Sequence, residues 1–228
     1  MGGTPQHGAF HALTIDLTVY YAVQPPDKTH TQAPALLLAL HGWGQHCKRF
    51  LKAFQPLRDR NVLVAAPQAP HQFYVSLSPK KVGFNWLTLY HRDQGIADVN
   101  GYLARLLGVL QERYPYDPAR IFLLGFSQGV SMAYRFAVSG GVQPAGLIAC
   151  CSDLPPDVAK KLPSAVPFPV LLAYGADDTL VPEDKTHEAA AALAAHGFPF
   201  EEYRFAGGHE VTADLVAKVG GWMAAQAA

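Results

Sequence analysis

The stretch "IFLLGFSQGVSMAYRF", from Ile121 to Phe136, decides the fold. Its apolar start runs into Gly125-Phe126-Ser127-Gln128-Gly129, and a helical pattern follows at once. The two glycines allow the backbone to turn sharply without a Cβ clash. A serine at such a strand-to-helix junction is typical of a nucleophile elbow, in which the hydroxyl is raised toward a substrate. The alternative interpretation is that Ser127 only caps the helix.

Strand-like and helical segments alternate along the rest of the chain, which predicts an α/β fold with a mostly parallel central sheet flanked by helices. Ala12–Gln24 predicts one or two early strands at an antiparallel edge, and His71–Arg92 predicts an irregular, aromatic-rich segment. The other predicted strands are Ala35–Gly42, Asn61–Pro70, Arg120–Phe126, Pro144–Ser152, Phe168–Asp178 and Phe200–Glu210. The predicted helices are Cys47–Arg60, Gly95–Tyr114, the segment from Ser127, Pro182–His196 and Ala213–Ala227. Without repeats or a low-complexity linker, residues 1–228 are expected to form a single domain with no separate cap.

Composition and charge exclude several classes of function. Lys plus Arg equals Asp plus Glu at 18 each, so no nucleic-acid-binding surface is expected. The N-terminal residues "MGGTPQHGAF" lack the pattern of a secretory signal, and the apolar runs are too short for an integral membrane segment. Three cysteines, two of them adjacent (Cys150 and Cys151), suit neither a disulfide framework nor a zinc site. We therefore expect a cytoplasmic protein without a metal or cofactor, and the oligomeric state stays open.

A serine nucleophile needs a base and an orienting acid, and both are expected in loops after later strands. Asp177 and Asp178 follow the strand "FPVLLAYG", and spacing alone does not choose between them. His209 follows the last strand in "FAGGHE", whereas His187 and His196 belong to a helical pattern. His209 is therefore the predicted base.

Two backbone N–H groups are also needed to bind the oxyanion of the tetrahedral intermediate. The amide of Gln128 is one candidate, and the loop in "LALHGWGQ" supplies the second, with Trp43 as the predicted donor. His41 precedes the serine in the chain, so we interpret it as a residue that holds this loop.

The predicted substrate-binding residues are Trp43, Phe73, Trp86 and Leu180. The aromatic residues of His71–Arg92 either cover a small satellite core or form a wall of an acyl pocket. The adjacent Cys150 and Cys151 lie in an apolar strand and are interpreted as core residues rather than thiol nucleophiles.

The motifs "HGWGQ", "APQAP", "GFSQG", "GADDTLVP" and "GGHE", in this order, resemble the phospholipase/carboxylesterase group of α/β-hydrolases, which includes bacterial carboxylesterases and acyl-protein thioesterases. The resemblance extends from about residue 35 over nearly all of the chain. It implies an α/β-hydrolase fold with Ser127, Asp178 and His209 as the triad, and Trp43 and Gln128 as oxyanion donors. The acid falls on Asp178 because the family places it three residues before the valine of the Val-Pro pair.

Three positions depart from the family pattern. Val130 stands where "GFSQGG" has its last glycine, "HGWGQ" replaces "HGLGD", and "GFNWLTLY" keeps the tryptophan of "SWFD" as Trp86 but lacks the acid. The expected function is a serine hydrolase of carboxylic esters or thioesters that acts through an acyl-enzyme. The alternatives are a peptidase or lactone hydrolase with the same triad, or a non-catalytic binding module of the same fold.

Overall fold

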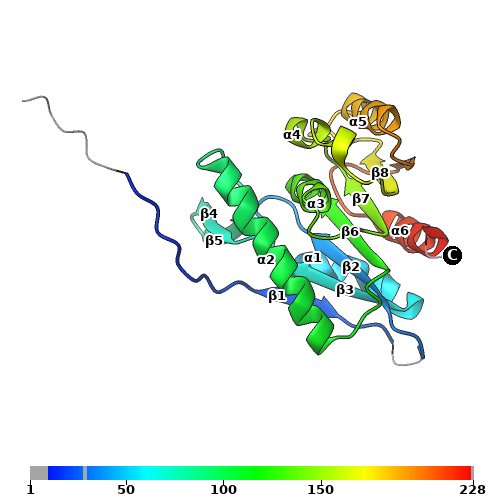
Figure 1. The fold of residues 1–228 in the computed structure, drawn as a ribbon, viewed down its shortest axis with the longest axis horizontal. Helices are drawn as coiled ribbons and strands as arrows, with labels where there is room; N and C mark the ends of the chain where they lie inside the picture. The colour runs from blue at the N-terminus through cyan, green and yellow to red at the C-terminus, as the bar shows by residue number, and fades with distance from the viewer. Residues whose placement is uncertain (1–9, 28–29, 227–228) are drawn as a thin grey trace, which may run out of the picture.

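The computed structural model describes residues 10–27 and 30–226, and a seven-stranded sheet lies at its centre (Figure 1). The strand order is β1-β3-β2-β6-β7-β8-β9. Only β1 is antiparallel to its neighbour, and the other pairs are parallel. The strands are β1 Tyr21–Gln24, β2 Ala35–Leu40, β3 Val62–Pro67, β6 Ile121–Phe126, β7 Gly146–Cys150, β8 Val170–Gly175 and β9 Phe200–Phe205. The predicted mostly parallel α/β sheet is confirmed.

Helices cover both faces of this sheet (Figure 1). One face packs against α2, α3, the short α4 and η2, and α5, and the other packs against α1, the 3₁₀ helix η1 and α6. The helices are α1 Cys47–Leu51, η1 Lys52–Arg60, α2 Arg92–Arg113, α3 Gln128–Val138, α4 Pro156–Ala159, η2 Leu162–Ser164, α5 Glu183–Ala195 and α6 Ala213–Gln226. Ala227, the predicted end of the last helix, lies outside the described residues.

The central strands β2, β3, β6, β7 and β8 are buried at every position. Burial on both faces explains why their sequences are continuously apolar rather than alternating. Because these strands are parallel, their carboxyl ends meet at one edge of the sheet, where ligands bind in such folds. The loops after β2, β6, β8 and β9 carry the predicted site residues to this edge.

Two predicted segments differ in the structure. Ala12–Gln24 forms a strand only over Tyr21–Gln24, because β3 offers pairing to this part alone. His71–Arg92 is not an irregular loop: it contains an antiparallel hairpin of β4 (His71–Leu77) and β5 (Lys80–Asn85). Most of β4 is exposed, so its sequence lacks the alternating apolar pattern by which a strand is recognised.

No helix in the described part of the chain is both long enough and apolar enough to cross a membrane.

Candidate active site

Ser127 lies at the junction of β6 and α3 in a strained backbone conformation, with φ 54° and ψ −124°. A positive φ is uncommon for a residue with a side chain, and such strain collects at functional sites. Two hydrogen bonds hold the turn: the Ser127 N–H donates to the Cys150 carbonyl (2.9 Å), and the Ser127 carbonyl accepts from the Val130 N–H (3.0 Å). This geometry is that of a nucleophile elbow rather than of an ordinary capping serine, whose backbone is extended.

The glycines on either side of Ser127 are required by close backbone approach. A Cβ at Gly125 would lie 2.3 Å from the Val130 Cα, and one at Gly129 would lie 2.2 Å from the Leu40 carbonyl oxygen. Neither backbone neighbour can move without disturbing α3, which holds Val130, or β2, which holds Leu40. The close approach of Gly129 to Leu40 also places the start of α3 directly against the end of β2, so Ser127 and the loop after β2 lie in one site.

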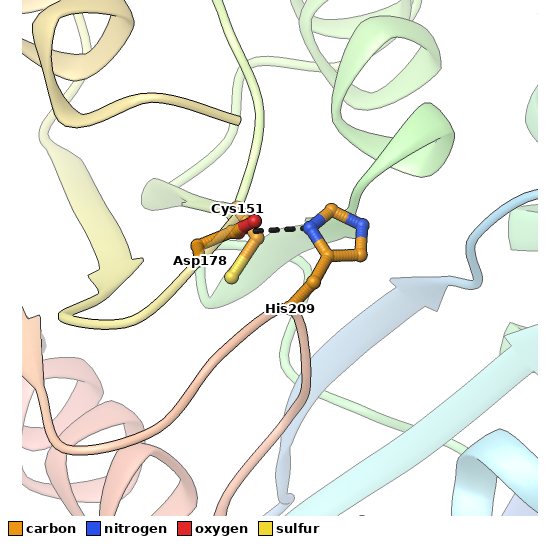
Figure 2. Close-up of side chains that lie close together, drawn as sticks. All are labelled: Cys151, Asp178 and His209. Atoms are coloured by element: carbon orange, nitrogen blue, oxygen red, sulfur yellow. Dashed lines mark hydrogen bonds and ion pairs between the residues drawn. The ribbon is translucent and has the colours of Figure 1, made fainter. Parts of the chain in front are cut away.

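Asp178 follows β8, and His209 lies in the loop after β9. The His209 Nδ1 is 2.8 Å from the Asp178 Oδ2 (Figure 2). The other carboxylate oxygen, Oδ1, accepts the backbone N–H groups of Leu180 (2.9 Å) and Val181 (3.0 Å). Because the loop fixes the carboxylate in this way, Asp178 can hold the imidazole in one orientation with the proton on Nδ1.

The Asp178 side chain is 1% exposed, and its environment favours the ionised form. Burial raises the pKa of this carboxyl group, but the hydrogen bonds from Val181, His209 and Leu180 together outweigh burial and lower the pKa below its usual value. Asp177, by contrast, is exposed and binds the Gly207 carbonyl through its backbone N–H. Of the two aspartates between which spacing alone did not choose, Asp178 is the one in contact with a histidine.

The His209 ring lies against Phe126, the residue before Ser127, with ring centroids 5.0 Å apart. Its Nδ1 faces Asp178, so its Nε2 is the nitrogen left for proton transfer. Within residues 10–27 and 30–226 no hydrogen bond joins the Ser127 hydroxyl to His209. The link between serine and histidine therefore stays a prediction.

Cys151 lies beside this pair, and sequence reasoning did not assign it to the site. Its sulfur, an Asp178 oxygen and a His209 nitrogen all lie within 4.8 Å of one another (Figure 2). The Cys151 side chain is buried, and its thiol makes a weak contact with the Glu210 carbonyl (4.0 Å). The backbone of Cys151 has a positive φ of 55°. Its position directly after a parallel strand was the available signal. Although these three atoms are types that bind metal ions, the Nδ1–Oδ2 hydrogen bond already engages two of the three ligand groups.

His41 holds the loop after β2 from the inside. The Ala69 N–H donates to its Nε2 (3.1 Å), so the proton lies on Nδ1, which donates to the Gly42 carbonyl (2.8 Å). Burial lowers the pKa of His41 to about 4, which keeps the ring neutral. The Trp86 Nε1–H donates to the His41 carbonyl (2.7 Å).

In the same loop the Trp43 N–H group differs from those of the neighbouring glycines. The Gly42 N–H donates to the Gln45 Oε1 (2.8 Å), and the Gly44 N–H donates to the Phe84 carbonyl (2.7 Å). Within the described part of the chain, neither the Trp43 N–H nor the Gln128 N–H donates to a protein acceptor. These are the two amides that the sequence predicts for the oxyanion.

The Gln128 side chain ties the elbow to the end of the hairpin. Its Oε1 accepts the Trp86 N–H (3.0 Å), and its Nε2 donates to the Asn85 Oδ1 (2.9 Å) and to the Leu87 carbonyl (3.1 Å). Asn85 is a second site-supporting residue that sequence reasoning missed. Only the tertiary contact between the hairpin and the elbow identifies it.

The four predicted substrate-binding residues lie in different surroundings. The exposed Trp43 packs on Phe73 with ring centroids 4.8 Å apart, and Leu180 is exposed next to the Asp178 loop. Trp86 is fully buried because its indole fills the core beneath His41, so it has no surface on a pocket wall.

A cavity of about 420 Å³ opens beside His209. It lies between α1 and the His209 loop, and its walls include Gln45, His46, Arg49, Phe50, Phe126 and His209.

Comparison with known proteins identifies the family of this chain. Residues 19–224 match the family described as Phospholipase/Carboxylesterase. "Putative esterase NocK" of Nocardia uniformis subsp. tsuyamanensis is 37% identical over 81 residues, which is 36% of this chain and 23% of that protein. The chain thus matches about a quarter of the length of this curated relative.

Solved structures share the fold. Esterase PE8 has a TM-score of 0.74 at 24% identity and covers 92% of this chain and 99% of its own. Zea mays acyl-protein thioesterase 2 has a TM-score of 0.67 at 22% identity, with the same coverage of both chains. The family match covers nearly the whole described chain, and the chain belongs to the phospholipase/carboxylesterase family of α/β-hydrolases.

Proposed function

We propose that this protein is a serine hydrolase that cleaves carboxylic esters or thioesters through an acyl-enzyme at Ser127. The observation that carries the proposal is the 2.8 Å hydrogen bond between Asp178 and His209, formed beside the strained elbow of Ser127. The names of esterase PE8 and of the maize acyl-protein thioesterase support an acyl group as the substrate. We further propose that residues 1–228 act as one domain without a separate cap.

In the proposed reaction the Ser127 Oγ attacks the acyl carbonyl carbon while the His209 Nε2 takes the hydroxyl proton. The carbonyl oxygen becomes an oxyanion and accepts hydrogen bonds from the Trp43 and Gln128 amides. As the intermediate collapses, the bond to the leaving alcohol or thiol breaks, and the imidazolium returns the proton to that group. Asp178 stabilises the imidazolium and keeps its own charge.

A water molecule then repeats these steps on the acyl-enzyme. Its proton passes to the His209 Nε2, its oxygen attacks the acyl carbon, and the acid leaves as Ser127 regains its proton. We propose that Trp43, Phe73 and Leu180 contact the acyl part, because Trp43 and Leu180 are exposed in the oxyanion loop and the acid loop, and the half-buried Phe73 packs on Trp43.

A p-nitrophenyl ester series from acetate to palmitate tests the chemistry. We expect turnover by the wild type and none above background for Ser127→Ala, with both proteins folded by circular dichroism. A fluorophosphonate probe should label the wild type at Ser127. If neither turnover nor labelling occurs, the hydrolase proposal fails, and a binding function takes its place. Labelling without turnover would show that the machinery works on a different acyl or leaving group.

Two neighbouring substitutions test the acid. Asp178→Asn should lower kcat by on the order of 10³- to 10⁴-fold, because an amide in this place favours the wrong imidazole tautomer. Asp177→Asn is the matched control and should change kcat little, since its side chain is exposed. A larger loss in Asp177→Asn than in Asp178→Asn would move the acid by one residue.

A further inference from the structure

The segment before β1, residues 10–20, is an extended arm whose apolar side chains are left in solvent. It leaves the sheet at β1 as an extended segment (Figure 1). Phe10 stacks on His91, just before α2, with ring centroids 5.5 Å apart. Leu13 is 86% exposed, Ile15 74% and Leu17 61%. Contiguous exposed apolar surface is typical of sites that bind another molecule.

The arm has the sequence of a β-strand with one apolar face. From Leu13 to Val23 the chain reads "LTIDLTVYYAV", in which every odd-numbered position is apolar. Tyr21 and Val23 at the end of this row pack against the core on the α2 side of the sheet. The odd-numbered side chains of the arm therefore continue a face that is already buried in β1.

The free edge of the sheet is available to this arm. β1 is the terminal strand, and β3 is its one partner among the described strands. The Tyr20 carbonyl accepts the Gln68 N–H (2.8 Å), so the even-numbered backbone groups point toward β3. By the alternation of an antiparallel ladder, the N–H and C=O groups of the odd-numbered residues point outward, where they can pair with a further strand.

Features that normally protect such an edge are lacking. Asp16 is the only Asp, Glu, Lys or Arg between residues 10 and 24, and this stretch contains no proline. Natural edge strands carry lysines, prolines or bulges, and these features discourage pairing with another strand.

We propose that the arm pairs with the arm of a second copy of this chain, so that the two sheets join edge to edge across a two-fold axis. A second copy is the occupant that supplies an identical open edge and an identical unpaired arm, as an isologous interface requires. The backbone N–H groups of the odd-numbered residues in each copy then donate hydrogen bonds to the backbone carbonyl groups of the odd-numbered residues in the other copy. The apolar faces of both arms lie on the same side of the joined sheet, next to α2.

The register follows from parity and charge. When two copies of the arm pair in antiparallel fashion, residue i of one copy lies opposite residue j of the other, and the sum i + j is the same for every pair. Only an even sum places the odd-numbered apolar residues of one copy opposite those of the other. A two-fold axis at Asp16 would bring two carboxylates face to face, which is destabilising. Leu17 lies at the centre of the apolar row from Leu13 to Tyr21, so a two-fold axis there pairs the whole row. Leu17 then faces its own copy, Ile15 faces Val19, and Asp16 faces Thr18. We assign this register to the dimer.

Two lysine variants test the interface, with light scattering after size exclusion as the readout. The wild type should elute at twice the chain mass of 24.6 kDa. Leu17→Lys sets two ammonium groups opposite each other on the apolar face and should shift the protein to monomer, with at least a tenfold rise in the dimer dissociation constant. Thr18→Lys is the matched control: its lysine faces Asp16 of the other copy, so the dimer should persist.

A cross-link tests the register. Residues opposite each other in a hydrogen-bonded antiparallel pair lie about 5.5 Å apart at Cα, within reach of a disulfide. Leu17→Cys should form a covalent dimer under mild oxidation, whereas Ala12→Cys, far from its own copy in this register, should not. The native cysteines Cys47, Cys150 and Cys151 are buried.

The proposal is overturned if the wild type is a monomer, if Leu17→Lys dimerises as well as Thr18→Lys, or if Ala12→Cys cross-links as readily as Leu17→Cys. A monomer whose unfolding midpoint falls in Leu17→Lys would show instead that the arm packs on its own chain. None of these readouts depends on hydrolytic activity, so they stand apart from the proposed function.

Discussion

At the scale of single residues, the site depends on side chains whose surroundings differ sharply although their positions in the sequence are similar. Asp177 and Asp178 are adjacent, yet one is exposed and the other is buried against His209. His41 and His209 both follow strands, yet His41 is enclosed and neutral, while His209 has a free Nε2. Residue type and order in the chain identify the candidates, and burial and hydrogen bonding assign their roles.

The buried His41 predicts a pH dependence of stability. Burial lowers its pKa from 6.5 to about 4. Between these values the unfolded chain binds a proton that the folded protein does not, so the free energy of unfolding decreases as the pH falls from 6.5 to 4. The loss of stability caused by His41 should reach about 3 kcal/mol at pH 4. Above pH 6.5 this contribution to stability is fully present.

Urea unfolding of the wild type and of His41→Asn, from pH 7.5 to 4.5, measures this effect. His41→Asn should be less stable at pH 7.5 and should lose less stability on acidification. His71→Asn, on the exposed strand β4, is the control and should keep the wild-type slope. Equal slopes in His41→Asn and the wild type would contradict the prediction.

At the scale of elements, the strand–elbow–helix unit is the part that local sequence determines most completely. The glycines at 125 and 129 are needed for backbone contacts within the unit and with β2, and the apolar run of β6 suits a strand buried on both faces. The hairpin β4–β5 is the opposite case. Its strands are held by pairing with each other and by the hydrogen bonds of Gln128 to its end, which no local pattern reveals.

Glycine-to-alanine variants distinguish glycines that are required by close backbone contacts from glycines with open space at the Cβ position. Gly129→Ala should destabilise the protein severely, because its Cβ would lie 2.2 Å from the Leu40 carbonyl oxygen. Gly101 and Gly108 lie inside α2 with open space at the Cβ position, so Gly101→Ala and Gly108→Ala should each stabilise it by about 0.5–1 kcal/mol. Thermal unfolding followed by circular dichroism reports both effects. Loss of stability in Gly101→Ala would show that α2 has a partner at this face.

At the scale of the whole molecule, an ion network joins three helices on the α2 side of the sheet. Asp157 in α4 accepts the Arg135 side chain of α3 (2.8 and 2.9 Å) and the Arg92 side chain at the start of α2 (2.7 Å). Arg135 is buried, and its hydrogen bonds, together with those from Arg92, hold the pKa of Asp157 well below its usual range.

Asp157→Asn should lower the free energy of unfolding by about 2–4 kcal/mol, because it leaves the buried Arg135 cation without its counter-charge. The matched control is Glu188→Gln, which breaks an exposed pair with Lys185 on α5 and should change the free energy of unfolding little. Chemical denaturation of both variants gives the comparison. Equal losses would show that the network contributes no more than an exposed ion pair.

The sequence by itself determined the α/β class, the mostly parallel sheet, the elbow at Ser127 and the strand-end positions of Asp178 and His209. These features are local: continuous apolar runs report strands buried on both faces, and glycines report close backbone turns. The tertiary structure put Asp178, and not Asp177, in contact with His209, brought Cys151 and Asn85 to the site, and buried Trp86 beneath His41. It also left the predicted strand before Tyr21 unpaired. Such outcomes depend on which distant segments meet, and contacts between segments far apart in the chain leave no periodic trace in either one.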